Sequence, residues 1–171
     1  DEVFRGSIRS VSFQRINSRT GETETHRFKV RIPAGVQDGQ LIRVAGKGET
    51  GSGGAAAGDL YLRVRLAAHP DFQVQGSDLV ADLDLAPWEA VLGATVSVPT
   101  LDGRVHVRVP AGSRNGQPLR VRTRGLPSAD GARGDLYVNL RVDVPTAVTD
   151  EERAVWERLA AVSKYAPRGA E

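Results

Sequence analysis

Apolar and polar residues alternate along several short stretches of the chain. The alternation runs through residues 28–32, 60–66, 79–85 and 105–109, where every second side chain is Val, Leu, Ile, Phe or Ala. A period of two places apolar side chains on one face of a β-strand and polar side chains on the other. Pro-Ala-Gly, Asp-Gly and Asn-Gly segments lie between these stretches, and such residues favour tight turns. The pattern predicts a mainly β protein with half-buried strands.

Only the last part of the chain has an extended helical pattern. Thr149 and Glu152 have the spacing of a capping box at a helix start. The apolar stripe that follows consists of Val155, Trp156, Leu159 and Val162. We expect this helix to dock its stripe on the preceding domain or on a partner. A short helical turn is also predicted where Pro87 follows a strand.

The chain contains an internal repeat. Residues 30–48 align without gaps to residues 107–125, and ten of these nineteen positions are identical. The tetrapeptide Gly-Asp-Leu-Tyr at 58–61 recurs at 134–137. Self-similarity of this kind indicates two copies of one structural unit. We therefore predict a first β domain over 1–69, a second over 70–147 and a helical segment over 148–171.

The second copy is the more complete one. It begins with the alternating stretch 79–85, and the first copy has no counterpart of this stretch. By symmetry the counterpart would lie just before Asp1. We therefore interpret the chain as a fragment that lacks a strand of its first unit.

Composition excludes several classes of protein. The 171 residues include no Cys, which excludes disulfides, zinc knuckles, thiol nucleophiles and iron–sulfur sites. No apolar run approaches the length of a membrane-spanning helix. The 23 basic and 21 acidic residues leave a net charge of +2, which is weak evidence for a nucleic-acid partner.

No catalytic or metal-binding motif is present in the sequence. His26, His69 and His106 lack a second ligand at the spacing that a metal site requires. The glycine-rich segment 46–58 precedes no helix that could bind a phosphate. The serines lack the surroundings of a hydrolase nucleophile. We expect no enzyme activity, no metal and no cofactor.

Several motifs, in order, carry a family resemblance over nearly the whole chain. They are Val-Arg-Ile-Pro-Ala-Gly at 30–35, the two Gly-Asp-Leu-Tyr blocks, His-Pro-x-Phe at 69–72 and Val-Pro-Thr-Leu-Asp-Gly at 98–103. With them the chain resembles the tandem C-terminal substrate-binding domains of DnaJ-type co-chaperones. It has no J-domain and no cysteine-rich zinc module. It is therefore similar to the zinc-free subclass and to its curved-DNA-binding-protein branch.

The resemblance implies a fold, a function and a location. The two domains would be small β-sandwich or barrel-like units in a cytoplasmic protein. The first would bind unfolded or misfolded client segments by strand addition, for delivery to a DnaK-type ATP-dependent chaperone. The client-binding positions that it implies are Val11, Phe13, Phe28 and Phe72, with Arg9 as a basic position. For Val11, Phe13 and Phe28 a role in the strand core remains an alternative, whereas Phe72 lies in a linker and is expected in the groove.

Two further expectations concern partners. The terminal helix resembles the family's dimerisation segment, so Val155, Trp156, Leu159 and Val162 are predicted to join two chains as a homodimer. DNA binding is the alternative function. Arg120, Arg122 and Arg124 alternate and would share one strand face as candidate phosphate contacts, or form a solvated face paired with acids. A purely structural β-repeat arm would have neither activity.

Overall fold

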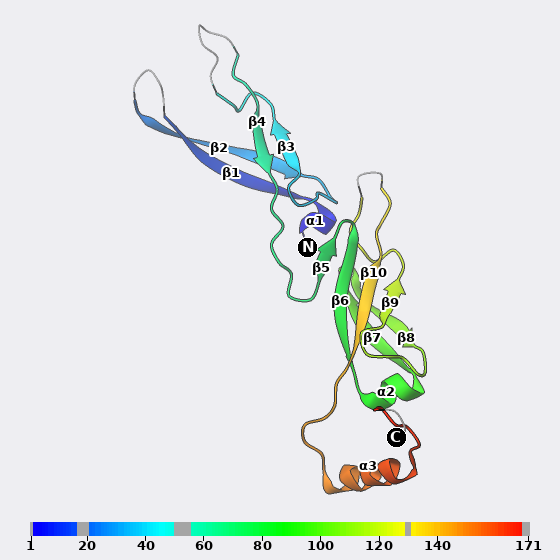
Figure 1. The fold of residues 1–171 in the computed structure, drawn as a ribbon. Coiled ribbons are helices and arrows are strands. Elements are labelled where there is room, and N and C mark those ends of the chain that lie inside the picture. Colours follow the sequence, from blue (N-terminus) through cyan, green and yellow to red (C-terminus); the bar gives the residue numbers. More distant parts are fainter. Residues whose placement is uncertain (1, 17–20, 50–55, 129–130, 169–171) are drawn as a thin grey trace.

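The chain forms an elongated molecule of two β units and a terminal helix (Figure 1). The computed structural model describes residues 2–16, 21–49, 56–128 and 131–168. Helix α1 and strands β1 to β4 make the first unit, and β5 to β10 with α2 make the second. Helix α3 lies at the far end of the second unit (Figure 1). The prediction of a mainly β protein with a C-terminal helix is confirmed, and the domain boundary at residue 69 stays a prediction.

The first unit consists of two antiparallel strand pairs. Its elements are α1 (Glu2–Arg5), β1 (Ser7–Ile16), β2 (Thr23–Ile32), β3 (Leu41–Val44) and β4 (Leu60–Arg63). Strands β1 and β2 pair over ten residues, from Ser7 opposite Ile32 to Ile16 opposite Thr23. Strands β3 and β4 pair over four residues. Strand β2 starts at Thr23, five residues before the predicted alternation at 28–32. The reason is that the pairing of β2 with β1 continues through a polar segment.

The second unit is built around a four-stranded sheet and a hairpin. Its elements are β5 (Gln73–Gln75), β6 (Asp78–Leu85), α2 (Pro87–Leu92), β7 (Ala94–Thr100), β8 (Gly103–Val109), β9 (Pro118–Val121) and β10 (Leu136–Val142). The sheet has the order β5-β6-β10-β9. Strand β10 runs parallel to β6 and antiparallel to β9. The β7–β8 hairpin packs Val98 into the same core cluster as Leu79 and Leu136.

The buried core lies mainly in the second unit. Leu136, Val138 and Leu140 of β10 are at most 1% exposed. The equivalent residues of the first unit are Leu60 and Leu62 in β4 and Val64, which follows β4. All three are only half-buried. Strand β6 covers one side of β10, whereas no described residue forms a strand in that place beside β4. The two repeats therefore share a sequence pattern but differ in how much apolar surface they bury.

The two units meet through α1 and the turn that follows β2. Val3 and Phe4 of α1 pack against the core of the second unit, and the Arg133 guanidinium lies 4.8 Å from the centroid of the Phe4 ring. Gly35 in the turn has φ of +74°, and a Cβ there would collide with the Pro127 carbonyl. Glycine is required at this position both by its conformation and by the close approach of the second unit.

Helix α3 (Asp150–Val162) starts with the predicted capping box. The Thr149 hydroxyl accepts from the Glu152 amide at 3.2 Å, and the Thr149 amide donates to the Glu152 carboxylate at 2.8 Å. None of its residues is buried. Within the described ranges, no helix combines the length and apolar character needed to cross a membrane.

Candidate functional site

An aromatic and apolar cluster covers one face of the β1–β2 hairpin. Val11 lies directly opposite Phe28 in the strand register. The Phe13 ring meets the Phe28 ring edge-on at 5.9 Å between centroids and stacks on the His26 ring at 5.4 Å. We call Val11, Phe13, His26 and Phe28 the hairpin cluster. The structure thus brings together three of the predicted client-binding residues.

Strand periodicity explains why these side chains share a face. Val11 and Phe13 are two residues apart on β1, and His26 and Phe28 are two apart on β2. Cross-strand pairs of this kind stabilise a hairpin, and rings prefer edge-to-face or offset contacts. All four side chains are half-buried, so part of each remains accessible. His26 was not predicted as a site residue, although its spacing of two from Phe28 is the signal that could have found it.

Arg9 lies on the same face of β1, nearer to α1. Its guanidinium forms an ion pair with Glu2, at 2.6 Å from Nη2 to Oε1 and 3.2 Å from Nε to Oε2. Both side chains are largely exposed. An acidic ligand at Arg9 would therefore compete with the Glu2 carboxylate.

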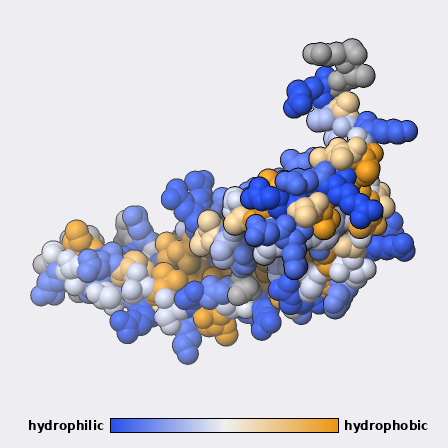
Figure 2. Space-filling view, turned by 90° about the horizontal axis from the view of Figure 1, so that it is seen from below, coloured by the Kyte–Doolittle hydropathy of each residue, from blue (hydrophilic) through white to orange (hydrophobic). Residues whose placement is uncertain are grey.

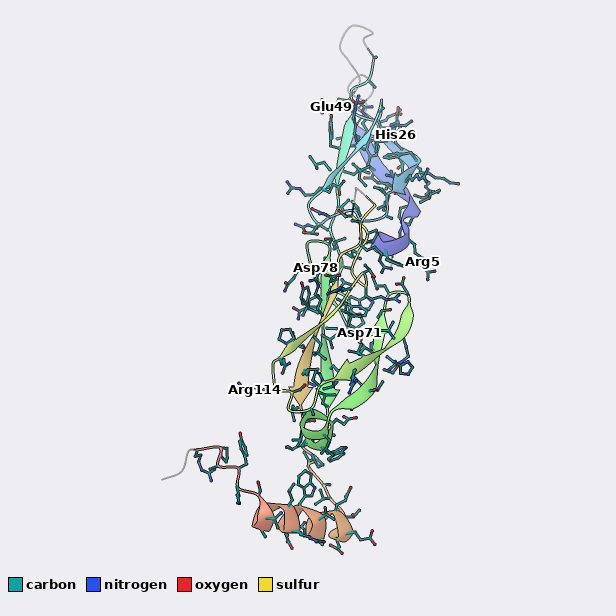
Figure 3. All side chains as sticks on the ribbon, turned by 90° about the vertical axis from the view of Figure 1, so that its right-hand side faces the viewer. Arg5, His26, Glu49, Asp71, Asp78 and Arg114 are labelled. Atoms are coloured by element: carbon teal, nitrogen blue, oxygen red, sulfur yellow. The ribbon has the colours of Figure 1, made fainter. Side chains whose placement is uncertain are left out.

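Phe72 lies away from the hairpin cluster. It is 6% exposed and belongs to the second unit's core, beside Leu79 and Leu126. The expectation that a linker aromatic would stay out of the core is wrong, because the linker folds onto the sheet as β5 begins at Gln73. In Figure 3 its neighbour Asp71 lies in the second unit, well separated from His26 in the first. A hollow of about 600 Å³, lined by residues that include Leu66 and Phe72, opens beside it.

The three predicted phosphate contacts do not alternate along one strand. Strand β9 ends at Val121, and Thr123 has φ of +56°, so the chain turns between Arg122 and Arg124. That part of the prediction is wrong, because the strand ends before the second and third arginines. Arg120 forms an ion pair with Asp135, and Arg124 forms one with Asp102. Two of the three cations are thus paired with acids, as the alternative interpretation described.

The Arg120–Asp135 pair is part of a repeated structural device. Asp135 accepts the Thr123 amide at 2.7 Å as well as the Arg120 guanidinium, and these contacts hold the pKa of Asp135 below its usual range. In the first unit Asp59 accepts the Gly46 amide at 2.9 Å and the Arg43 guanidinium at 2.6 Å, and its pKa is lowered likewise. In each unit the Asp of the Gly-Asp-Leu-Tyr block therefore stabilises a turn through a backbone amide and an arginine. This shared role is consistent with the recurrence of the motif.

A row of cations lies on the outer face of β2. Arg27, Lys29 and Arg31 alternate along β2 with His26 and Phe28, so they lie on the opposite face from the hairpin cluster. All three are exposed. They face Ser12, Ser10 and Ile8 of β1 in the register, so no acid stands directly opposite them. This basic row was not predicted as a site, although it follows from the same period of two.

The predicted dimerisation stripe is largely exposed. Val155 and Val162 are each 68% exposed and Leu159 is 51% exposed. Trp156 is half-buried, and its ring lies 6.2 Å from that of Trp88 in α2. Hollows of about 480 and 520 Å³ flank Trp156. Figure 2 shows that apolar side chains reach the surface in separate patches among polar ones.

No metal site is evident in the part of the chain that the structure describes. Within those residues, no group of three or more His, Cys, Asp or Glu side chains is placed to hold a metal ion.

Comparison with known proteins identifies the family to which the chain belongs. The family model of the DnaJ C-terminal domain matches residues 1–145. A curved DNA-binding protein of Pseudomonas putida is 46% identical over 98% of the chain, and one of Coxiella burnetii is 42% identical over 98%. The chain spans about half the length of these relatives, 54% in both cases. The chain belongs to the DnaJ C-terminal domain family, in its zinc-free, curved-DNA-binding-protein-like branch.

Proposed function

We propose that the chain binds unfolded or misfolded polypeptide segments through the hairpin cluster of its first unit. The observation that carries the proposal is the half-buried group of Phe13, His26 and Phe28 on one face of a long hairpin. Accessible rings supply apolar contact area, and an extended client can add main-chain hydrogen bonds along a strand edge. Such binding depends little on client sequence, as a chaperone requires.

Membership of the family supports a DnaJ-type role for this binding. The client would be handed to a DnaK-type ATP-dependent chaperone in the cytoplasm. A J-domain would contact that chaperone, and none lies within these 171 residues. Arg9 would meet an acidic ligand only after Glu2 releases it, and Phe72 would contribute at the separate hollow beside Leu66.

A Phe13→Ala variant tests the role of the hairpin cluster. The measurements are suppression of aggregation of an unfolded protein and the anisotropy of a labelled apolar peptide. An aromatic contact is worth about 0.5–1.5 kcal/mol beyond its buried area, so we expect peptide affinity to fall at least about twofold to tenfold. Ile8→Ala is the matched control, because Ile8 lies on the same strand but on the opposite face and is 68% exposed.

The double variant Phe13→Ala/Phe28→Ala gives the decisive result. If circular dichroism shows an intact fold and both measurements match the unmodified chain, the hairpin cluster is not the client site. A loss of equal size in Ile8→Ala would also contradict the assignment, since it would indicate a general effect on β1.

Homodimerisation through α3 completes the proposal. Exposed Val155, Leu159 and Val162 would meet a second copy, and Trp156 would be enclosed between them. Two client sites in one dimer would raise the effective affinity for a single unfolded chain without new contacts.

DNA binding is the second candidate function. The relatives named above are called curved DNA-binding proteins, and the basic row offers exposed cations for phosphates. The row supports this function better than Arg120 and Arg124, which are paired with acids. Each neutralised phosphate contributes about 0.9 to the slope of log affinity against log salt concentration.

The salt dependence of DNA affinity tests this candidate. Replacing Lys29 and Arg31 by Ser should reduce the slope by about two and weaken binding to all sequences alike. Arg120→Ser serves as the control and should leave the slope unchanged. Affinity that is undetectable at low salt, or a slope that the Lys29 and Arg31 changes do not alter, would end the proposal.

A further inference from the structure

The basic row on β2 has an equivalent on β8 of the second unit. The alignment of the two repeats matches each residue of the basic row to an exposed residue of β8. These equivalents are Arg104, His106 and Arg108, which we call the β8 row. Neighbouring members are two residues apart, so they share one strand face and recur about every 6.7 Å along it.

Alternation along β8 directs the β8 row away from the core. Val105 and Val107, which alternate with the row, pack against the core cluster that contains Val98, and Val109 is 1% exposed. The β8 row therefore lies on the solvent-facing side of the β7–β8 hairpin. The basic row lies in the same way on the side of β1 and β2 that is opposite the hairpin cluster.

Hydroxyl groups rather than carboxylates lie opposite two members of the β8 row. In the strand register Thr95 lies opposite Arg108, and Ser97 lies opposite His106. Arg104 donates to the Ser97 hydroxyl at 2.8 Å and to the Ser97 carbonyl at 2.9 Å, two neutral groups that leave its charge uncompensated. Two serines of β1 lie opposite the basic row in the same manner. Cations beside hydroxyl groups are the side chains that contact DNA phosphates.

The acid that is nearest in sequence to the β8 row is already neutralised. Asp102 lies in the turn between β7 and β8, and both Arg124 and Arg133 bind it at 2.8 Å. Each Asp–Arg ion pair in the described part of the second unit joins residues outside β7 and β8. The β8 row therefore keeps a local positive charge, although the net charge of the whole chain is only +2.

We propose that the β8 row is a second DNA-contacting surface and that one duplex binds it together with the basic row. This inference rests on the proposed DNA-binding function and gives that function a surface in the second unit. The two hairpins belong to successive units of an elongated molecule (Figure 1). Duplex DNA carries one negative charge per about 1.7 Å of its axis, so a duplex along the molecule offers phosphates to both rows.

Replacing Arg104 and Arg108 by Ser tests the β8 row. The measurement is the anisotropy of a labelled duplex of about 40 base pairs, or about 136 Å, at several salt concentrations. The slope of log affinity against log salt concentration should fall by about two, because each neutralised phosphate contributes about 0.9. The matched control Arg104→Lys/Arg108→Lys keeps both charges and should keep the slope. Since Arg104 also bonds to Ser97, Arg108→Ser is measured alone and should lower the slope by about one.

A gain of charge gives a test that unfolding cannot imitate. His106→Lys introduces the residue type found at the equivalent Lys29, and lysine keeps its charge at about pH 8, where histidine is ordinarily neutral. The slope should rise by about 0.9. Gln75→Lys is the control, because it adds the same charge at an exposed position on β5, in the other sheet. An equal rise in both variants would overturn the proposal, since it would indicate a general effect of charge.

The same titrations separate this inference from the DNA-binding function itself. If Lys29→Ser/Arg31→Ser lowers the slope and Arg104→Ser/Arg108→Ser does not, the β8 row makes no DNA contact and the DNA function stands. If the unmodified chain has no detectable affinity at low salt, both fail. Additive reductions in a variant with all four changes support one duplex on both rows. A combined reduction no larger than that of either pair would refute it.

Discussion

The difference between the two cores leads to a paired stability prediction. Leu136 and Leu60 are the same residue type at equivalent positions of the repeat, yet Leu136 is 0% exposed and Leu60 is half-buried. Truncation of either to Ala removes about three carbons, each worth about 0.8 kcal/mol when fully buried. At Leu136 a cavity term of about 24 cal/mol per Å³ adds to this loss.

These contributions predict unequal costs for the same substitution. Leu136→Ala should lower the free energy of unfolding of the second unit by about 3–4 kcal/mol. Leu60→Ala should cost the first unit about 1 kcal/mol, because its side chain keeps part of its contact with water and leaves no closed cavity.

Urea denaturation with two probes can separate the units. Both tryptophans, Trp88 and Trp156, belong to the second unit and α3, so their fluorescence reports on that end of the molecule. Far-UV circular dichroism and amide exchange report on the first unit as well. Equal costs for the two substitutions would refute the reasoning, because they would show that Leu60 is as well covered as Leu136.

Three further predictions follow from single contacts. Because the pKa of Asp135 is lowered in the folded state by the Thr123 amide and Arg120, its contribution is present above the unfolded-state pKa of about 3.9 and is lost as pH falls through the folded value. The free energy of unfolding of the Asp135→Asn variant should therefore fall less steeply with decreasing pH in the acid range than that of the unmodified chain. An equally steep fall would contradict the role of this contact. Thr149→Ala should reduce the stability of α3 by about 1 kcal/mol, seen as a loss of helical dichroism on mild heating, whereas identical melting would argue against the cap. Trp156→Ala should shift the sedimentation mass from two chains to one at tens of micromolar and alter the emission of Trp88; a mass of one chain in the unmodified protein would contradict dimerisation.

Much of the fold could be predicted from local pattern. Alternation located strands β2, β4, β6 and β8, because a half-buried strand needs opposite polarity on its two faces. The capping box located the start of α3, because Thr149 and Glu152 satisfy orphan amides within one turn. The repeat separated the chain into equivalent units without any three-dimensional information.

The candidate sites were predicted less evenly. Val11 and Phe13 share one face because the strand period places them there, and the β1–β2 register then brings Phe28 opposite Val11. Phe72 could not be assigned in this way, since its burial depends on how β5 and β6 join β9 and β10, which lie far along the chain. The turn at Thr123, which separates Arg122 from Arg124, depends on Asp135, twelve residues further along.

The sequence by itself determined the family, the two-fold repeat and the strands with their inner and outer faces, because these depend on residue spacing within short segments. The tertiary structure alone decided which repeat has the more deeply buried core and which arginines are already paired with acids. These outcomes depend on which distant strands become neighbours. Parallel pairing of β6 with β10, 57 residues apart in sequence at Asp84 and Arg141, buries one core. Among the described residues β4 pairs with β3 alone, and Leu60, Leu62 and Val64 stay half-buried.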